Sequence, residues 1–180
     1  MEDETNGLIH LYHGPGKGKT TAAVGLCVRA LGHGQTVTLL QFMKGTGNEV
    51  NQYGEVQLLM SLDDAVVKQF PTGHAQSADA LSDAEQEGLN SALDIATETL
   101  GDGQSDLVVL DEILTLHSIG VIDEQRLLAV LQSKADSVEL VITGREAPTG
   151  VIDMADYVSY IGSVKHPFQR GISARVGIEY

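Results

Sequence analysis

Cysteine, tryptophan and basic residues are scarce in this sequence of 180 residues. The only cysteine, Cys27, can form neither an intramolecular disulfide nor a cysteine-based metal site. Lys and Arg together number 11 against 25 Asp and Glu, which gives a formal net charge of −14. Such a charge repels the phosphates of nucleic acids, so we expect no nucleic-acid partner. The acidic bias fits either solubility or an adaptation to high salt, and the sequence leaves both interpretations open.

Long apolar runs are also missing. No stretch approaches the length needed to cross a bilayer, and no charged-then-apolar leader precedes the first strand-like run. We therefore expect a cytoplasmic protein without a membrane partner. The hydrophobic share of 42% and the charged share of 20% are typical of globular proteins. The length predicts one domain over residues 1–180, in which residues 1–6 form a short, flexible acidic tail.

A glycine-rich stretch lies between an apolar run, residues 8–12, and a helical run, residues 22–31: Gly14-Pro15-Gly16-Lys17-Gly18-Lys19-Thr20-Thr21. Its glycines let several backbone N–H groups converge on one point, where the helix N-terminus adds its positive dipole end. Lys19 supplies a charge for terminal phosphate oxygens, and the Thr20 hydroxyl can ligate Mg²⁺. The pattern is one residue shorter than G-x-x-x-x-G-K-[ST], with His13 at the position of the generic first glycine. We predict that residues 13–21 bind the triphosphate of ATP; the alternative is a loop that only turns the chain.

Strand-like and helix-like segments alternate after this loop. The patterns predict strands at 36–43, 56–60, 107–110, 138–143 and 157–161, and helices at 82–100 and 123–135. Ser82 and Glu85 have the spacing of a capping box, and Gly101 closes that helix. Residues 61–77 give no clear pattern. The alternation predicts a three-layer α/β fold like that of P-loop NTPases, with a mostly parallel β-sheet flanked by helices.

Two carboxylates follow the apolar run of residues 107–110. Asp111 and Glu112 stand where a P-loop protein places the acid that holds Mg²⁺ directly or through water. We predict a metal site made of Thr20 with Asp111 or Glu112, and which acid touches the metal stays open. The alternative is a strand-end aspartate that caps the next helix.

Two basic residues are placed at the expected carboxyl ends of strands, where loops line the ligand crevice of parallel sheets. Lys44 begins the loop of residues 44–48 and is a candidate contact for phosphate or substrate, or an ordinary solvated lysine. Arg145 follows Gly144 and offers a guanidinium to a triphosphate. Its alternative is a surface ion pair with Glu146 or Asp153.

Six segments carry a resemblance to a known family: GKGKTTAA (16–23), RALGHG (29–34), QFMKG (41–45), LVVLDE (107–112), TGREAP (143–148) and KHPFQRGISARVGIEY (165–180). In this order they resemble the ATP:cob(I)alamin adenosyltransferases of the CobA/BtuR type. The shortened loop is also the family's form. The last segment is the most discriminating, because generic P-loop ATPases do not carry it.

The resemblance implies that ATP binds in reverse, with its C5′ atom facing a corrinoid. Co(I) attacks C5′, and inorganic triphosphate leaves. Because Co(I) has no proton to lose, no general base is required, and the site must align ATP and neutralise the leaving group. Lys19, Thr20 and Glu112 are the expected catalytic residues, with Mg²⁺ as cofactor and Arg145 as a further contact. The resemblance also favours a homodimer and a flavin-type reductase that supplies Co(I).

The sequence departs from the family in residues 50–104. Some members carry a Phe and a Trp there that shield cobalt, whereas this chain has no Trp. Phe70 and His74 are the candidates for the corrinoid side, although a solvent-exposed loop histidine is the alternative for His74. A phosphotransferase or ATPase that attacks the γ-phosphate, and a non-catalytic nucleotide-binding protein, are the alternative functions. The preferred corrinoid stays open.

Overall fold

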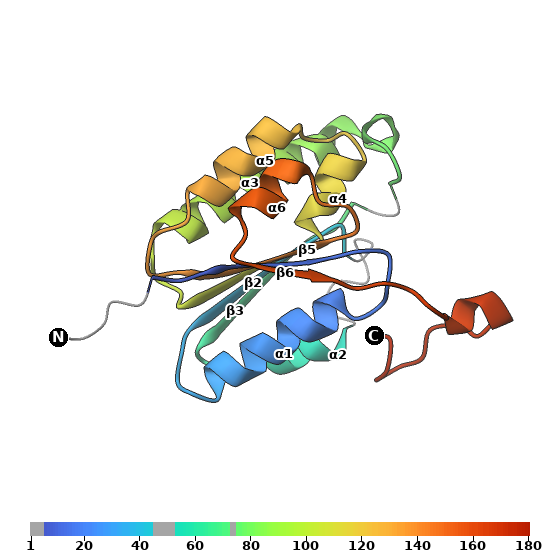
Figure 1. Cartoon of the computed structure of the whole chain (residues 1–180), viewed down its shortest axis with the longest axis horizontal. Helices are drawn as coiled ribbons and strands as arrows, with labels where there is room; N and C mark the ends of the chain where they lie inside the picture. Colours follow the sequence, from blue (N-terminus) through green and yellow to red (C-terminus); the bar gives the residue numbers. More distant parts are fainter. Residues whose placement is uncertain (1–5, 45–52, 73–74) are drawn as a thin grey trace.

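The computed structural model describes residues 6–44, 53–72 and 75–180 as a six-stranded sheet between two layers of helices (Figure 1). The strands lie side by side in the order β3-β2-β4-β5-β1-β6, and every neighbouring pair is parallel. Their bounds are β1 Ile9–His13, β2 Val37–Phe42, β3 Ala65–Phe70, β4 Leu107–Asp111, β5 Glu139–Gly144 and β6 Tyr157–Tyr160. The three-layer α/β prediction is confirmed.

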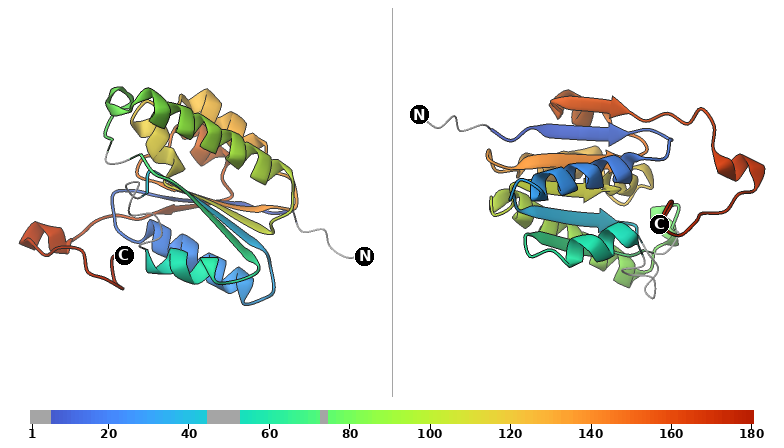
Figure 2. Two further views of the ribbon diagram at one scale, coloured as in Figure 1. Left: turned by 180° about the vertical axis from the view of Figure 1, so that it is seen from behind. Right: turned by 90° about the horizontal axis from the view of Figure 1, so that it is seen from below.

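Helices cover both faces of the sheet (Figure 2). One face carries α1 Lys19–Leu31 and α2 Gly54–Met60, and the other carries α3 Asp83–Gly101, α4 Ile113–Ser118, α5 Glu124–Gln132 and α6 Thr149–Met154. Two short 3₁₀ segments are η1 Ala78–Ala80 and η2 Pro167–Arg170. No helix in the described part of the chain is both long and apolar enough to span a bilayer. Every residue of strands β2 and β4 is buried, as is typical of the inner strands of a parallel sheet.

The expected strand at residues 56–60 is wrong. The segment belongs to helix α2, in which Val56 and Leu59 are buried while Leu58 and Met60 are exposed. This spacing of three is a helical face, and a five-residue segment with four apolar residues cannot distinguish the two structures by length alone. The third strand of the chain is instead β3, inside the stretch of residues 61–77 that gave no clear pattern.

The capping box that the sequence predicts at the start of α3 is confirmed. Ser82 and Glu85 form a capping box, in which the Glu85 N–H donates to Ser82 Oγ and the Ser82 N–H donates to Glu85 Oε2. Asp123 caps α5 by accepting from the Arg126 N–H at 2.8 Å. The short helices α4 and α6, six residues each, had no sequence signal.

Strand order determines which loops meet. The glycine-rich turn follows β1, and β5 separates β1 from β4 in the sheet. Because all strands are parallel, the carboxyl ends of β1, β5, β4 and β2 lie at one edge. Lys19, Thr143, Asp111 and Lys44 therefore come from different parts of the sequence to the same end of the sheet.

Candidate active site

The glycine-rich turn, residues 14–18, is held from outside by the chain that follows β6. The Gly16 N–H donates to the carbonyl oxygen of Ile161 at 2.8 Å, and the Ile161 N–H donates to that of His13 at 2.7 Å. A Cβ at Gly14 would lie 2.5 Å from the Ile161 oxygen, and one at Gly16 would lie 2.5 Å from the Gly162 oxygen. Glycine is therefore needed here for close backbone approach, a reason that the sequence did not reveal.

Lys19 is the first residue of α1, and its side chain folds back over the turn. Its ammonium donates to the carbonyl oxygens of Gly14 and Gly16, both at 2.9 Å. The residue is 7% exposed, and this burial lowers the pKa of Lys19, while the nearby carboxylate of Glu112 offsets part of the effect. A positive charge is thus placed inside the turn, where it can attract an anion.

Asp111 is fully buried and accepts hydrogen bonds from three elements. Thr20 Oγ1 donates to its two oxygens at 2.9 and 3.1 Å, Thr143 Oγ1 donates to Oδ1 at 2.7 Å, and Gln41 Nε2 donates to Oδ2 at 3.1 Å. Lys44 Nζ lies 4.0 Å from Oδ2. Asp111 therefore joins the start of α1 to the sheet, and the alternative role as a cap of the next helix is wrong because the N-cap of α4 is residue 112.

Glu112 has different surroundings from its neighbour. Its backbone is left-handed, with φ 63° and ψ 17°, which is uncommon for a residue other than glycine. Its N–H donates to Thr143 Oγ1 at 2.9 Å, and its Oε2 accepts from Thr115 Oγ1 at 2.7 Å. Glu112 lines a cavity, whereas Asp111 lies behind Thr20. The two adjacent carboxylates thus face different environments.

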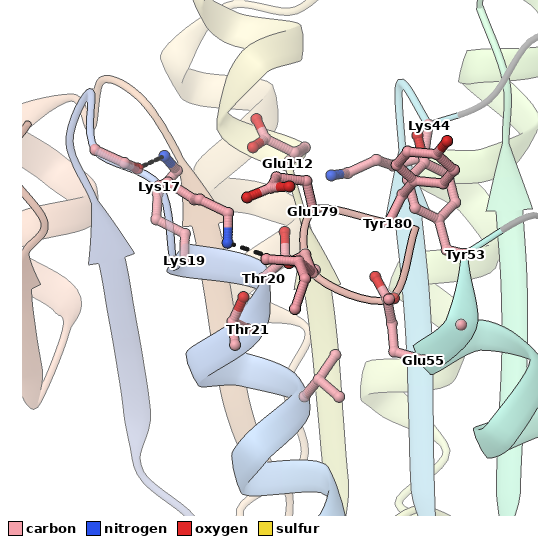
Figure 3. Close-up of a pocket in the computed structure, with 16 residues that line it drawn as sticks. Lys17, Lys19, Thr20, Thr21, Lys44, Tyr53, Glu55, Glu112, Glu179 and Tyr180 are labelled. Atoms are coloured by element: carbon pink, nitrogen blue, oxygen red, sulfur yellow. Dashed lines mark hydrogen bonds between the residues drawn. The ribbon is translucent and has the colours of Figure 1, made fainter. Parts of the chain in front are cut away.

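The cavity beside the turn has a volume of about 460 Å³, and residues from several elements point towards it (Figure 3). Eight of the predicted site residues line it: Gly16, Lys17, Gly18, Lys19, Thr20, Thr21, Lys44 and Glu112. The rest of its wall comes from Val24, Tyr53, Gly54, Glu55, Gly177, Ile178, Glu179 and Tyr180. Lys44 Nζ lies 5.7 Å from the centre of the Tyr53 ring. The wall combines cations, carboxylates and aromatic rings.

The other predicted contacts lie around the turn rather than in the cavity wall. Pro15 is exposed, and the His13 ring packs edge-on against Tyr160 at 5.4 Å between centroids. The Gly14 N–H donates to the carbonyl oxygen of Arg145 at 2.8 Å, while the Arg145 side chain is exposed. Among the described residues, Arg145 forms no ion pair with a carboxylate, so the alternative pairing is not found.

The carboxyl-terminal segment leaves the end of β6, passes through η2 and turns back, so that residues 177–180 reach the cavity (Figure 2). Lys17 Nζ donates to the carbonyl oxygen of Ile178 at 3.3 Å. Arg175 and Glu179 form an ion pair at 3.1 Å, and hydrogen bonds from Arg175 lower the pKa of Glu179 to about 2. The residue patterns did not indicate this part of the wall, because segment 165–180 has no periodic pattern. Only the family resemblance singled it out.

Phe70, one of the two candidates for the corrinoid side, does not line this cavity. Phe70 packs on Phe42, with ring centroids 5.3 Å apart, and lines a second cavity of about 270 Å³ between the end of β3 and the start of α3. The Phe70 side chain lies on the face of the sheet that carries α3. His74 lies outside the described residues, as does the loop segment 45–48.

Oxygen donors dominate the possible metal site. The Thr20 hydroxyl and the carboxylates of Asp111 and Glu112 are hard ligands of the kind that Mg²⁺ prefers. Within the described residues, no three His, Cys, Asp or Glu side chains gather as a metal cage. That donor set fits an ion bound by one or two carboxylates together with substrate phosphates.

The parallel sheet and the glycine-rich turn before α1 place the chain among α/β proteins with a P-loop-like domain. Within this class it belongs to the family described as ATP:corrinoid adenosyltransferase BtuR/CobO/CobP, whose model matches residues 5–180. It is 33% identical over 179 residues to the corrinoid adenosyltransferase CobA of Salmonella typhimurium, covering 98% of this chain and 87% of that protein. It is also 33% identical to corrinoid adenosyltransferases of Pseudomonas aeruginosa and Escherichia coli, covering 98% and 99% of this chain and 85% and 88% of those proteins.

Proposed function

We propose that this protein transfers the 5′-deoxyadenosyl group of ATP to the Co(I) centre of a corrinoid and releases triphosphate. One observation carries the proposal beyond family membership. The glycine-rich turn and residues 177–180, which lie at opposite ends of the sequence, line the same cavity. The first is a triphosphate-binding signal, and the second belongs to the segment that generic P-loop ATPases lack. Their meeting supports one site that combines phosphate binding with the family's own chemistry.

The proposed reaction needs a good leaving group more than a base. The cobalt lone pair forms the Co–C5′ bond, the C5′–O bond breaks, and its electron pair leaves with the triphosphate. Lys19 and the N–H groups of residues 17–20 would bind the triphosphate oxygens, with Lys44 and Arg145 as outer cations. These positive groups stabilise the charge that develops as the C5′–O bond breaks, and the reversed orientation of ATP leaves C5′ free to face the corrin.

Magnesium is the proposed cofactor, because the oxygen donors beside the turn fit it. Thr20, with Asp111 or Glu112, would hold the ion. When bound, it neutralises triphosphate charge alongside Lys19. Asp111 keeps Thr20 in position, since Thr20 Oγ1 donates to both of its carboxylate oxygens. Of these two acids, Glu112 lines the cavity, so a ligand there would meet Glu112 before Asp111.

The remaining proposals rest on the family resemblance. We assign Phe70 and His74 to the corrinoid side, and we expect a flavin-type reductase to deliver the Co(I) corrinoid. A homodimer and a cytoplasmic location are likewise proposals. The alternative function, a phosphotransferase or ATPase that attacks the γ-phosphate, is not favoured, since the matching relatives are corrinoid adenosyltransferases.

The identity of the broken bond tests this function. The protein is incubated with ATP, Mg²⁺ and chemically reduced cobalamin, while the corrinoid spectrum is followed and triphosphate is assayed. We expect triphosphate and a photolabile adenosyl-corrinoid to form in equal amounts. The β,γ-imido analogue of ATP keeps its C5′–O bond and should still donate its adenosyl group, whereas it blocks a kinase or ATPase. An inert analogue, together with ADP formation from ATP in the presence of Co(I) corrinoid, would favour the phosphotransferase.

A further inference from the structure

A row of polar side chains crosses the carboxyl end of the sheet, where the strands are otherwise apolar. Gln69 of β3, Gln41 of β2 and Asp111 of β4 are direct partners in the register of these parallel strands. Two residues earlier on β2 and β4, Leu39 and Val109 belong to the apolar cluster that α1 covers. The row therefore occupies core positions on this face, and its last member reaches the cavity through Thr20.

Hydrogen-bond chemistry gives the row a single direction. An ionised carboxylate only accepts, so the Gln41 amide presents its NH₂ group to Asp111, with Nε2 and Oδ2 3.1 Å apart. The carbonyl oxygen of the same amide then faces β3, where Gln41 Oε1 accepts from Gln69 Nε2 at 2.9 Å. Gln69 must therefore act as a donor to Gln41. A glutamate or an aliphatic side chain at position 69 would lack that donor.

Asp111 is held from the opposite side as well. The Thr143 hydroxyl accepts from the Glu112 N–H, so its own proton is directed to Asp111 Oδ1, at 2.7 Å. Gln41 fixes Oδ2, and Thr143 fixes Oδ1. The carboxylate is thus clamped between its two neighbouring strands while Thr20 bridges both oxygens.

Because these side chains are buried, the arrangement is unfavourable unless every polar atom has a hydrogen-bond partner. Gln41 and Asp111 are both 0% exposed. A buried amide or carboxylate that loses its partner keeps the cost of leaving water without a hydrogen bond in return, and this cost is larger when the group is charged. An aliphatic residue of similar size at position 41 would fill the space without that requirement. Packing alone therefore does not account for two glutamines in this row.

We propose that Gln41 and Gln69 are positioning residues that act in series to hold the Asp111 carboxylate against the Thr20 hydroxyl. Gln69 orients the amide of Gln41, and Gln41 orients the carboxylate of Asp111. The inference deepens the proposed function, on which it rests, by adding the groups behind the predicted metal ligands. Such outer partners typically change metal affinity 10- to 100-fold when they are removed.

Metal affinity in the presence of ATP tests this serial arrangement, here called the relay Gln69–Gln41–Asp111, without relying on turnover. Mn²⁺ replaces Mg²⁺ as the probe, and electron paramagnetic resonance measures how much free Mn²⁺ the protein removes beyond the amount that ATP binds by itself. The variants are Gln41→Met, Gln69→Met and the double variant, with Gln132→Met as a control at an exposed position at the end of α5. We expect about 10- to 100-fold weaker binding for Gln41→Met, a smaller loss for Gln69→Met and no change for the control.

Action in series makes a stricter prediction. Gln69→Met should add nothing once Gln41 has been replaced, because its effect passes through that amide. Circular dichroism checks that each variant folds, and Gln69→Glu, at a half-buried position, provides a second loss of the donor if a Met variant does not fold. Wild-type affinity in the single variants, or an equal added loss from Gln69→Met in the double variant, overturns the relay. If the wild-type protein with ATP does not bind Mn²⁺ at all, the proposed metal site fails together with it.

Discussion

At the scale of single residues, Lys19 and Thr20 divide the start of α1 between two tasks. The ammonium of Lys19 is bonded to the carbonyl oxygens of its own turn, whereas the hydroxyl of Thr20 is bonded to Asp111 on β4. One side chain therefore provides charge to the cavity, and the other connects the helix to the sheet. This division allows substitutions to separate phosphate binding from the support of the metal ligands.

Replacing Lys19 by Ala is expected to abolish adenosyl transfer and leave the protein folded. The side chain contributes charge beside the cavity, so turnover should fall about 100-fold or more. Thermal unfolding and initial rates with saturating corrinoid measure the two effects. Lys68→Ala, at an exposed position on β3, is the matched control and should keep wild-type activity. Activity of Lys19→Ala within a few-fold of wild type would contradict the assignment of the turn.

As the pH rises, the affinity for ATP should begin to decrease at a lower pH than it would if Lys19 had the ordinary pKa of a lysine. Burial lowers the pKa of Lys19 below 10.5, and only the protonated ammonium attracts the triphosphate. Above that lowered pKa, the dissociation constant should rise about tenfold per pH unit. Lys19→Arg keeps its charge, so its profile should stay flat over the same range. Isothermal titration calorimetry at a series of pH values from neutral to alkaline distinguishes the two profiles. The same pH dependence of the dissociation constant in both proteins would refute the role of Lys19.

At the scale of elements, two glycines of the same region should respond in opposite ways to the addition of a side chain. Gly16 lies where a Cβ would meet the backbone of Ile161 and Gly162, so Gly16→Ala should destabilise the protein by about 1–3 kcal/mol. Gly25 lies within α1 with open space around it, so Gly25→Ala should stabilise by about 0.5–1 kcal/mol. Urea unfolding of both variants measures the difference. Equal effects would mean that the chain after β6 does not support the turn.

Strong local signals predicted the elements that carry the site. The turn before α1, the apolar strands β4 and β5 and the cap of α3 each follow from neighbouring residues. The patterns predicted a strand where α2 lies, because a short, mostly apolar segment such as residues 56–60 fits either period, and they gave no prediction for β3. Neither the return of segment 177–180 to the cavity nor the Gln41–Gln69 pair could be predicted, since both depend on which distant strands become neighbours.

At the scale of the whole molecule, the buried thiol connects global stability to pH. Cys27 is 0% exposed in the apolar cluster between α1 and the sheet. This burial raises its pKa to about 12 from an ordinary value of 9.0. The unfolded protein therefore loses this proton first, and stability should fall as the pH rises from about 9 towards 12. The contribution is at most about 4 kcal/mol across that window.

Comparison with Cys27→Ala isolates this contribution from the tyrosines and lysines that titrate in the same range. The variant is expected to be less stable at neutral pH, because the cavity costs packing. Its free energy of unfolding should nevertheless decline less steeply above pH 9 than that of the wild type. Parallel slopes in urea titrations at successive pH values would mean that the thiol makes no such contribution.

The attachment of residues 161–162 to the glycine-rich turn also has a kinetic consequence. Strand β6 is one of the two edge strands, and its four residues are all exposed, whereas most of those of the other edge strand, β3, are partly buried. It should therefore be the least protected strand against local opening. Its opening breaks the bonds of both Ile161 and Gly16. In native-state hydrogen exchange, these two amides should therefore exchange together, as one cooperative unit. The lifetime of the closed turn is then determined by the fraying of an edge strand more than 140 positions away along the chain.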